Sequence, residues 1–235
     1  MVKILNVGSV NIDHVMEVPA FVRPGETLAS TGYQIFGGGK GANQSVAIAR
    51  AGAHVRHIGK IGRDGLWLRD LLAEAGVDVS ALQVGETHTG FAMIQVDRQG
   101  ENAIILYPGG NFEFGEDDLD DAFTEVSPGD WLLLQNEIAP QTIAAAIEKG
   151  AELGLQIALN PAPMKDNIRE LPLEKLSLLI LNELEGESLA GCSDPSQIIE
   201  RLQARYPHLQ IVLTLGREGV LWAHGDNQCH QPAYD

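Results

Sequence analysis

Four short, mainly apolar runs with at most one polar residue each most constrain the fold of this 235-residue chain, and they span 131–134, 155–159, 176–181 and 211–215. Runs of this length without polar alternation are typical of strands that are buried on both faces of a parallel sheet. Other segments carry apolar residues at helical spacing, such as Ala144, Ile147 and Ala151. The alternation predicts an α/β fold in three layers, with helices on both faces of a mostly parallel sheet.

Two regions interrupt this alternation, at residues 14–36 and 87–108. Both lack a helical pattern, and both read as antiparallel β ribbons. A β appendage without helices of its own cannot bury both faces, so we expect it to cover either an active site or a partner subunit. We therefore expect a single α/β domain over residues 1–235 that carries these two β segments as a lid.

Composition excludes several classes of protein. The chain has 32 acidic and 16 basic residues and a formal net charge of -16, which argues against nucleic-acid binding. Cys192 and Cys229 are too few for a disulfide framework. A metal cluster of Cys229 with His224 and His230 lacks the four ligands in paired spacings that structural zinc sites bring. The longest apolar runs have only five residues, as at 143–147, and are far too short to span a bilayer, so we expect a cytoplasmic protein without membrane association.

A glycine run stands out at Gly37-Gly38-Gly39, followed by Lys40-Gly41-Ala42-Asn43. It joins an expected strand to a helix that should start near Ala42. Glycine leaves amide hydrogens uncovered and permits positive φ, and the free amides of a helix start add partial positive charge. Lys40 and Asn43 add donors that suit a polyol. We expect a small-molecule site here, although a glycine turn that only lets a helix pack tightly on a strand has the same pattern.

Nucleotide-binding motifs fit this run poorly. A Walker loop needs Ser or Thr after its lysine, and Gly41 follows Lys40. The spacing Gly37-x-Gly39-x-x-Ala42 matches a loose dinucleotide fingerprint. However, the acidic ribose ligand expected about twenty residues later is matched only by Asp64, beyond a second expected strand.

Polar residues recur where the expected strands end, which is where open parallel sheets bind ligands. They are Asn11 and Asp13, Asn136 and Glu137, Asn160, Asn182 and Glu185, and Thr214 and Gly216. Any one of them alone is commonly a turn residue or a helix cap. Their coincidence at five strand ends favours a site, in which Asp13 could bind two sugar hydroxyls and Glu185 could reach a hydrated magnesium ion that bridges phosphates.

Several longer motifs occur in a characteristic order. They are Gly8-Ser9-Val10-Asn11-Ile12-Asp13, Pro24-Gly25-Glu26-Thr27, Gly38-Gly39-Lys40-Gly41-Ala42-Asn43-Gln44, Pro108-Gly109-Gly110-Asn111, Asn160-Pro161-Ala162-Pro163, Asn182-Glu183-Leu184-Glu185 and Thr214-Leu215-Gly216. In these motifs, over its whole length, the chain resembles the ribokinase branch of the PfkB family of carbohydrate kinases.

The resemblance implies a ribokinase-like fold and ATP-dependent phosphorylation of a sugar hydroxymethyl group, with D-ribose phosphorylated at its 5-hydroxyl as the first expectation. It implies that the sugar is held by Asn11, Asp13, Gly39, Lys40, Asn43 and Glu137. Asn182, Thr214 and Gly216 would face the nucleotide, and Glu185 would act on Mg²⁺. It further implies a homodimer through the β lid and a monovalent cation such as K⁺ in the complete protein. Fructose, a deoxy sugar acid or a nucleoside would use many of the same groups.

The family's second signature, a Gly-Ala-Gly-Asp-like segment that opens a helix and supplies the catalytic base, is not found in this sequence. Residues 231–235 look like the strand that leads into it, and Asp235 is a poor substitute because no helix follows it. We therefore expect the base beyond Asp235 and no catalytic residue within the chain, so that the chain itself is inactive. A non-catalytic sugar-binding or regulatory protein derived from the family is the alternative hypothesis.

Overall fold

The computed structural model describes residues 3–234, and the chain divides into two compact units. The first unit comprises Met1–Val7 and Gly115–Asp235, and the second comprises Gly8–Phe114. Both expected β segments, 14–36 and 87–108, fall within the second unit. Asp235, the poor substitute for a catalytic base, lies outside the described residues.

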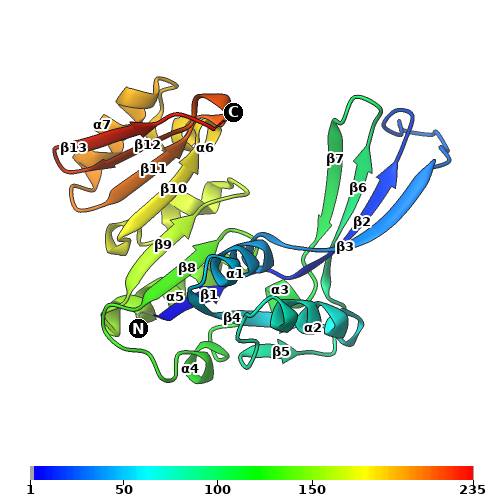
Figure 1. Ribbon diagram of the computed structural model, residues 1–235, viewed down its shortest axis with the longest axis horizontal. Helices are drawn as coiled ribbons and strands as arrows, with labels where there is room; N and C mark the ends of the chain where they lie inside the picture. The colour runs from blue at the N-terminus through cyan, green and yellow to red at the C-terminus, as the bar shows by residue number, and fades with distance from the viewer. Residues whose placement is uncertain (1–2, 235) are drawn as a thin grey trace. The chain divides into compact units, whose positions relative to one another are not determined.

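The first unit contains the parallel strands that the apolar runs predict (Figure 1). Its strands are β1 (Lys3–Val7), β8 (Trp131–Gln135), β9 (Gln156–Asn160), β10 (Leu178–Asn182), β11 (Gln210–Thr214), β12 (Val220–His224) and β13 (Asn227–Gln231). They follow the spatial order β13-β12-β11-β10-β9-β8-β1, in which every pair from β11 to β1 is parallel. Its helices are α4 (Leu119–Ala122), α5 (Pro140–Glu152), α6 (Glu183–Ala190) and α7 (Pro195–Arg205), with short 3-10 turns at Asp166–Glu170, Leu173–Lys175 and Gly216–Glu218.

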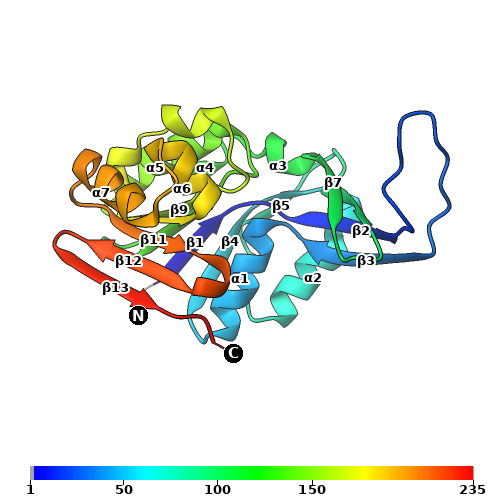
Figure 2. The same ribbon diagram turned by 90° about the horizontal axis from the view of Figure 1, so that it is seen from above.

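The core of the first unit lies between its sheet and its helices. Figure 2 shows α5, α6 and α7 on one face of the sheet, where α5 contacts β8 and β9 while α7 contacts β11. The sheet residues Leu132, Leu134, Leu179 and Leu213 are at most 1% exposed. Each such side chain contributes about 1.5–3 kcal/mol through burial, which holds the strand ends in place.

The end of the first unit differs from the expectation of a strand over residues 231–235. The last strand, β13, is Asn227–Gln231 and pairs antiparallel with β12. His224 pairs with Asn227, so Gly225 and Asp226 form a two-residue loop, and Gly225 has a φ of 55°. A glycine at positive φ is what a tight hairpin turn requires, and this local turn fixes the strand earlier than predicted.

The second unit combines helices with a small sheet (Figure 1). Its elements are β2 (Asn11–Glu17), β3 (Gly32–Gly38), α1 (Lys40–Arg50), β4 (His54–Ile61), η1 (Arg63–Gly65), α2 (Leu66–Glu74), β5 (Leu82–Val84), β6 (Gly90–Val96), β7 (Asn102–Tyr107) and α3 (Gly110–Glu113). Strands β4 and β5 are parallel, and both α1 and α3 contact β4. The strands β3, β2, β6 and β7, in this order, form the small sheet.

The small sheet consists of the two predicted antiparallel ribbons, β2–β3 and β6–β7. They are joined by a parallel pairing of β2 with β6 that the sequence did not predict. The register places Asp13, Phe36, Ala92 and Leu106 side by side on one face, which we call the Asp13 face. The opposite face, the His14 face, carries His14, Ile35, Met93 and Ile105 in the next row. Large apolar side chains of this sheet are exposed, namely Tyr33, Ile35, Phe36, Ile104, Ile105, Leu106 and Tyr107.

Within residues 3–234, none of the helices has both the length and the apolar character that a bilayer crossing requires.

Candidate functional site

The glycine corner, residues 37–43, lies beside the start of β2 in the second unit. Asn11 pairs with Gly38 across the β2–β3 ribbon. Gly39 has a φ of 92°, and a methyl group built on its Cα would lie 2.8 Å from the carbonyl oxygen of Ser9. Only glycine combines this φ with this close approach of two backbone segments. The corner therefore brings Lys40 and Asn43 of α1 next to the strand that carries Asn11 and Asp13.

Asp13 depends directly on a glycine of this corner. A methyl group on Gly38 would overlap the carboxylate oxygens of Asp13. The Asp13 side chain therefore lies over the bare backbone of the neighbouring strand and is half-buried. Any larger residue at position 38 would displace the carboxylate.

Two backbone amides at the start of α1 are hydrogen-bonded, although the sequence predicted that they would be free. The helix begins at Lys40, two residues before the predicted start. The amide of Gly41 donates to the Ser9 hydroxyl at 3.2 Å, and the amide of Ala42 donates to the Ser9 carbonyl at 2.8 Å. Ser9 is fully buried and satisfies these donors, so the amides of Gly41 and Ala42 are not available to a ligand. At these two positions the backbone serves tight packing against the segment before β2 rather than ligand binding.

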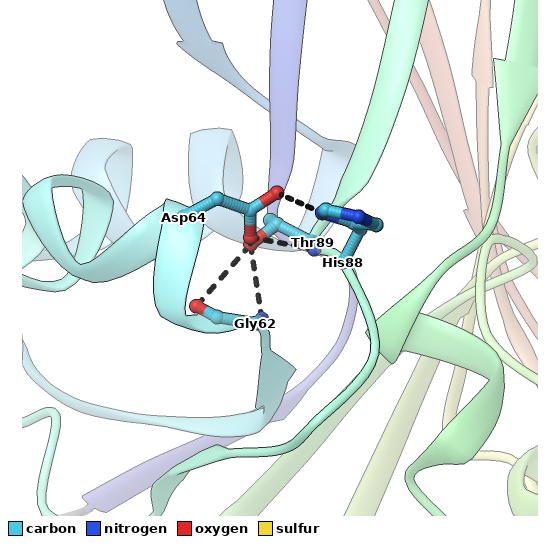
Figure 3. A network of polar contacts seen from close by, with 4 residues as sticks. All are labelled: Gly62, Asp64, His88 and Thr89. Atoms are coloured by element: carbon cyan, nitrogen blue, oxygen red, sulfur yellow. Dashed lines mark hydrogen bonds and ion pairs between the residues drawn. The ribbon is translucent and has the colours of Figure 1, made fainter.

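A second polar cluster binds the start of β6 to the turn after β4 (Figure 3). The carboxylate of Asp64 in η1 accepts two hydrogen bonds from Thr89, one from its amide at 2.9 Å and one from its hydroxyl at 2.7 Å. It also lies 3.0 Å from Nδ1 of His88, with which it pairs. The Thr89 hydroxyl in turn accepts from the Gly62 amide at 3.0 Å. Partial burial raises the pKa of Asp64, but the hydrogen bonds from Thr89 and His88 outweigh it and hold this pKa below its usual value. This cluster fixes the backbone from which the second ribbon of the small sheet rises.

A buried histidine lies behind the glycine corner. His57 on β4 is fully buried, and its Nδ1 shares a hydrogen bond of 2.9 Å with the Ser45 hydroxyl on α1. Burial lowers the pKa of His57 to about 4, so the ring is neutral at pH 7. A neutral ring links α1 to β4 without placing a charge in the core.

Asn111 is a buried polar residue to which the sequence assigned no role. Its Oδ1 accepts from the Val10 amide at 2.9 Å, and its Nδ2 donates to Asn11 Oδ1 at 2.7 Å. The only sequence signal was its place after two glycines in Pro108-Gly109-Gly110-Asn111.

In the first unit, Glu137 follows β8 and is half-buried. Its neighbour Asn136 is fully buried and donates from Nδ2 to the carbonyl of Pro163 at 2.8 Å. The Asn136 amide donates to the carbonyl of Ala162 at 3.0 Å. The Asn160-Pro161-Ala162-Pro163 motif therefore braces the loop from which Glu137 projects.

The predicted nucleotide residues lie at neighbouring strand ends of the first unit. Asn182 at the end of β10 is paired with Thr214 at the end of β11, and Gly216 follows with a φ of 53°. The exposed positions of Asn182, Thr214 and Gly216 fit a ligand at the carboxyl edge of the sheet.

Asn182 and Glu185 also form a capping box at the start of α6. Asn182 Oδ1 accepts from the Glu185 amide at 2.8 Å, and Glu185 Oε2 accepts from the Asn182 amide at 2.9 Å. The helix-cap role that the sequence left open is therefore present in this pair. One oxygen of Glu185 is committed to the cap, so a magnesium ion would meet the other oxygen. Among residues 3–234, no group of three or more His, Cys, Asp or Glu side chains is placed to hold a metal ion directly.

The fold and these strand ends define a class of protein, because solved structures with the same ribokinase-like α/β fold cover the whole chain. Ribokinase from Cryptococcus neoformans var. grubii serotype A in complex with ADP superposes with a TM-score of 0.82 at 33% identity, over 100% of this chain and 80% of that one. Ribokinase from Thermotoga maritima superposes with a TM-score of 0.84 at 29% identity, over 100% of this chain and 79% of that one.

The sequence comparisons give the family. The family model described as pfkB family carbohydrate kinase matches residues 1–235, and the chain belongs to this family. Ribokinase of Haemophilus influenzae is 37% identical over 91% of this chain and 72% of its own length. Ribokinase of Staphylococcus aureus is 34% identical over 99% of this chain and 79% of its own length. The predicted fold class and kinase family are thus confirmed.

Proposed function

We propose that this protein is an ATP-dependent sugar kinase that binds D-ribose and phosphorylates it at the 5-hydroxyl. The observation that carries the proposal is the Asp13 carboxylate, which lies over Gly38 beside the glycine corner in a chain 37% identical to a ribokinase. Deoxyribokinase of Salmonella typhimurium is 31% identical over 97% of this chain, so deoxyribose is the competing sugar.

The sugar residues follow from their donors and acceptors. Asp13 accepts hydrogen bonds from two ribose hydroxyls. Asn11, Lys40 and Asn43 supply hydrogen-bond donors, and Gly39 lets the sugar approach the backbone. Glu137 of the first unit adds a second carboxylate. An array of directed donors and acceptors fixes the orientation of a polyol, and orientation is a large part of catalysis in phosphoryl transfer.

The nucleotide residues are Asn182, Thr214 and Gly216, and Glu185 would help to hold hydrated Mg²⁺. Bound ATP and Mg²⁺ supply the phosphoryl group and neutralise its charge. A monovalent cation such as K⁺ would accompany them. The catalytic base is a residue of the family's Gly-Ala-Gly-Asp-like segment, so no residue of this sequence takes that role.

The small sheet serves as the lid of the sugar site and as the contact of a homodimer. Its Asp13 face carries the Asp13 carboxylate, which binds the sugar, so this face covers the sugar. The His14 face exposes Ile105 at 69% and Tyr33 at 54%, and a second copy of the chain covers it. The protein acts in the cytoplasm.

Titration calorimetry with ribose tests the sugar site. We expect heat from the wild-type chain and affinity that is lower by about 10- to 100-fold in Asp13→Asn, because hydrogen bonds to a charged group are among the strong ones. Glu17→Gln is the matched control, since Glu17 is an exposed carboxylate on the same strand and the same face. An absence of heat from folded wild-type protein, or equal affinities of wild type and Asp13→Asn, would refute the sugar assignment.

A coupled assay of ADP release with ribose and with deoxyribose tests the reaction, and it uses the chain joined to the Gly-Ala-Gly-Asp-like segment of a ribokinase so that a catalytic base is present. Faster release with ribose supports a ribose kinase, and faster release with deoxyribose reassigns the sugar. Ribose binding without any ADP release would favour the non-catalytic sugar-binding protein.

A further inference from the structure

Asn111 occupies a buried position between the small sheet and the proposed sugar residues. It follows β7 directly through Pro108, Gly109 and Gly110, and only 2% of its surface is exposed. Its side chain touches the first strand of the small sheet, because it bonds Val10 and Asn11 at the start of β2. A buried amide with both ends bonded to one short segment is a rigid support rather than a solvated surface group.

The chemistry of these bonds fixes the orientation of two side-chain amides. A backbone N–H can only donate, so the Asn111 atom that faces the Val10 amide is the oxygen. The other end of Asn111 is then its NH₂ group, which can only donate. The Asn11 atom facing it must accept, and it is therefore Asn11 Oδ1, at 2.7 Å. The remaining end of Asn11 is its NH₂ group, which makes no hydrogen bond with residues 3–234 and is left for a ligand.

We infer that Asn111 is a positioning residue that orients the Asn11 amide so that Asn11 presents hydrogen-bond donors, not an acceptor, to a sugar hydroxyl. The inference rests on the proposed function, in which Asn11 contacts the sugar. It assigns to Asn11 the chemistry opposite to that of Asp13, so one end of β2 offers a donor and an acceptor two residues apart. A hydroxyl that accepts from Asn11 and a hydroxyl that donates to Asp13 satisfy both.

The same bond ties the lid to the sugar site. A methyl group on Gly90, the first residue of β6, would lie 2.6 Å from Asn11 Oδ1 and would overlap Asn111 Nδ2. Asn11, Asn111 and Gly90 therefore pack without spare room at the base of the small sheet. Displacement of β6 or β7 at this point changes the position of the Asn11 amide.

Asn111→Asp reverses the orientation without a large change in shape. One carboxylate oxygen still accepts from Val10, but the other faces Asn11 and requires a donor. Asn11 must turn its NH₂ group towards position 111 and its oxygen towards the ligand. We expect ribose affinity, measured by calorimetry, to fall about tenfold, since the loss of one well-placed bond is worth about that factor.

A double-mutant cycle separates positioning from a general structural effect. In the Asn11→Ala background, Asn111→Asp should cause no further loss of ribose affinity, because no Asn11 amide is left to orient. A loss of the same size in both backgrounds would overturn the inference. If Asn11→Ala alone leaves ribose affinity unchanged, the sugar assignment of Asn11 fails instead, so the two failures are distinguishable.

Ser45→Ala is the matched control for stability, because it also removes a buried hydrogen bond within the second unit, between Ser45 and His57. It should lower the melting temperature without changing ribose affinity. Asn111→Ser provides a second variant without a buried charge. We expect it to weaken ribose binding in the wild-type background but not in Asn11→Ala, and equal weakening in both would also contradict the inference.

Discussion

The parallel sheet of the first unit and the small sheet of the second unit use the same apolar residue types in opposite ways. Leu179 and Leu213 of the first unit are fully buried, whereas Ile105 and Tyr33 of the small sheet are 69% and 54% exposed. The helices α5, α6 and α7 cover one face of the parallel sheet (Figure 2). The difference teaches that β propensity and hydrophobicity alone do not tell whether a strand belongs to the core or to a binding surface.

The largest difference in stability between the two sheets should appear when a single side chain of each is truncated. Leu213→Ala on β11 should lower the free energy of unfolding by about 2–5 kcal/mol, because it leaves a cavity in a covered sheet. Ile104→Ala on β7, with half of the native side chain exposed, should change it by only about 0.5 kcal/mol. Urea denaturation of both variants measures the difference. Similar losses would mean that the small sheet is as well covered as the parallel one.

The buried histidine gives the second unit a pH dependence that buried leucines cannot give. The pKa of His57 is about 4 in the folded protein, against 6.5 for an unperturbed histidine. As the pH falls, His57 is therefore protonated in the unfolded chain before it is protonated in the folded protein. The free energy of unfolding should consequently fall as the pH drops from about 6.5 to 4. Above that window His57 should not affect it. The full effect is roughly 3 kcal/mol.

The measurement is chemical denaturation between pH 4 and pH 8 of the wild type and of His57→Gln, whose amide does not titrate. The variant should not show the fall in the free energy of unfolding that protonation of His57 causes. The carboxylates contribute equally to both proteins. Parallel curves for the two proteins across the window would contradict a depressed His57 pKa.

A methyl group at the base of the small sheet should have an intermediate effect. Gly90→Ala would bring the new methyl to 2.8 Å from the Pro108 carbonyl oxygen, which is backbone and cannot rotate away. We expect a loss of about 1–3 kcal/mol in the free energy of unfolding and weaker ribose binding. Gly115→Ala is the control, since the nearest heavy atom to its new methyl is 4.0 Å away. Unchanged stability of Gly90→Ala would show that this base is loosely packed.

The smallest effect on stability is expected on the exposed strand β7, where neighbouring residues point to opposite faces. Ile105→Asp on the His14 face should change the unfolding free energy of the monomer by only about 0.5 kcal/mol but abolish the proposed dimer. Leu106→Asp on the Asp13 face should weaken ribose binding and leave the dimer intact. Sedimentation velocity measures the dimer, and calorimetry measures ribose binding. A dimer that survives Ile105→Asp would argue against the His14 face as the contact.

Much of the fold was predictable because its signals are local. The runs 131–134 and 211–215 became β8 and β11 within one residue at each end, and the helical stripe around Ile147 became α5. The strand ends also fell as expected, with Asn182 beside Thr214. The hairpin of β12 and β13 was missed, although Gly225 and Asp226 are an ordinary turn signal, because residues 220–224 show no clear polar alternation.

The sequence by itself determined the α/β class, the family and the residue types of the candidate site, because strand and helix periods and the order of motifs are written locally along the chain. The tertiary structure alone decided which polar groups are free to act. It assigned the Gly41 and Ala42 amides to Ser9, one Glu185 oxygen to a helix cap, and the Asn11 oxygen to Asn111 across 100 residues of sequence. A hydrogen-bond partner is set by distance and direction in space, and neither can be read from the identity of a residue and its neighbours.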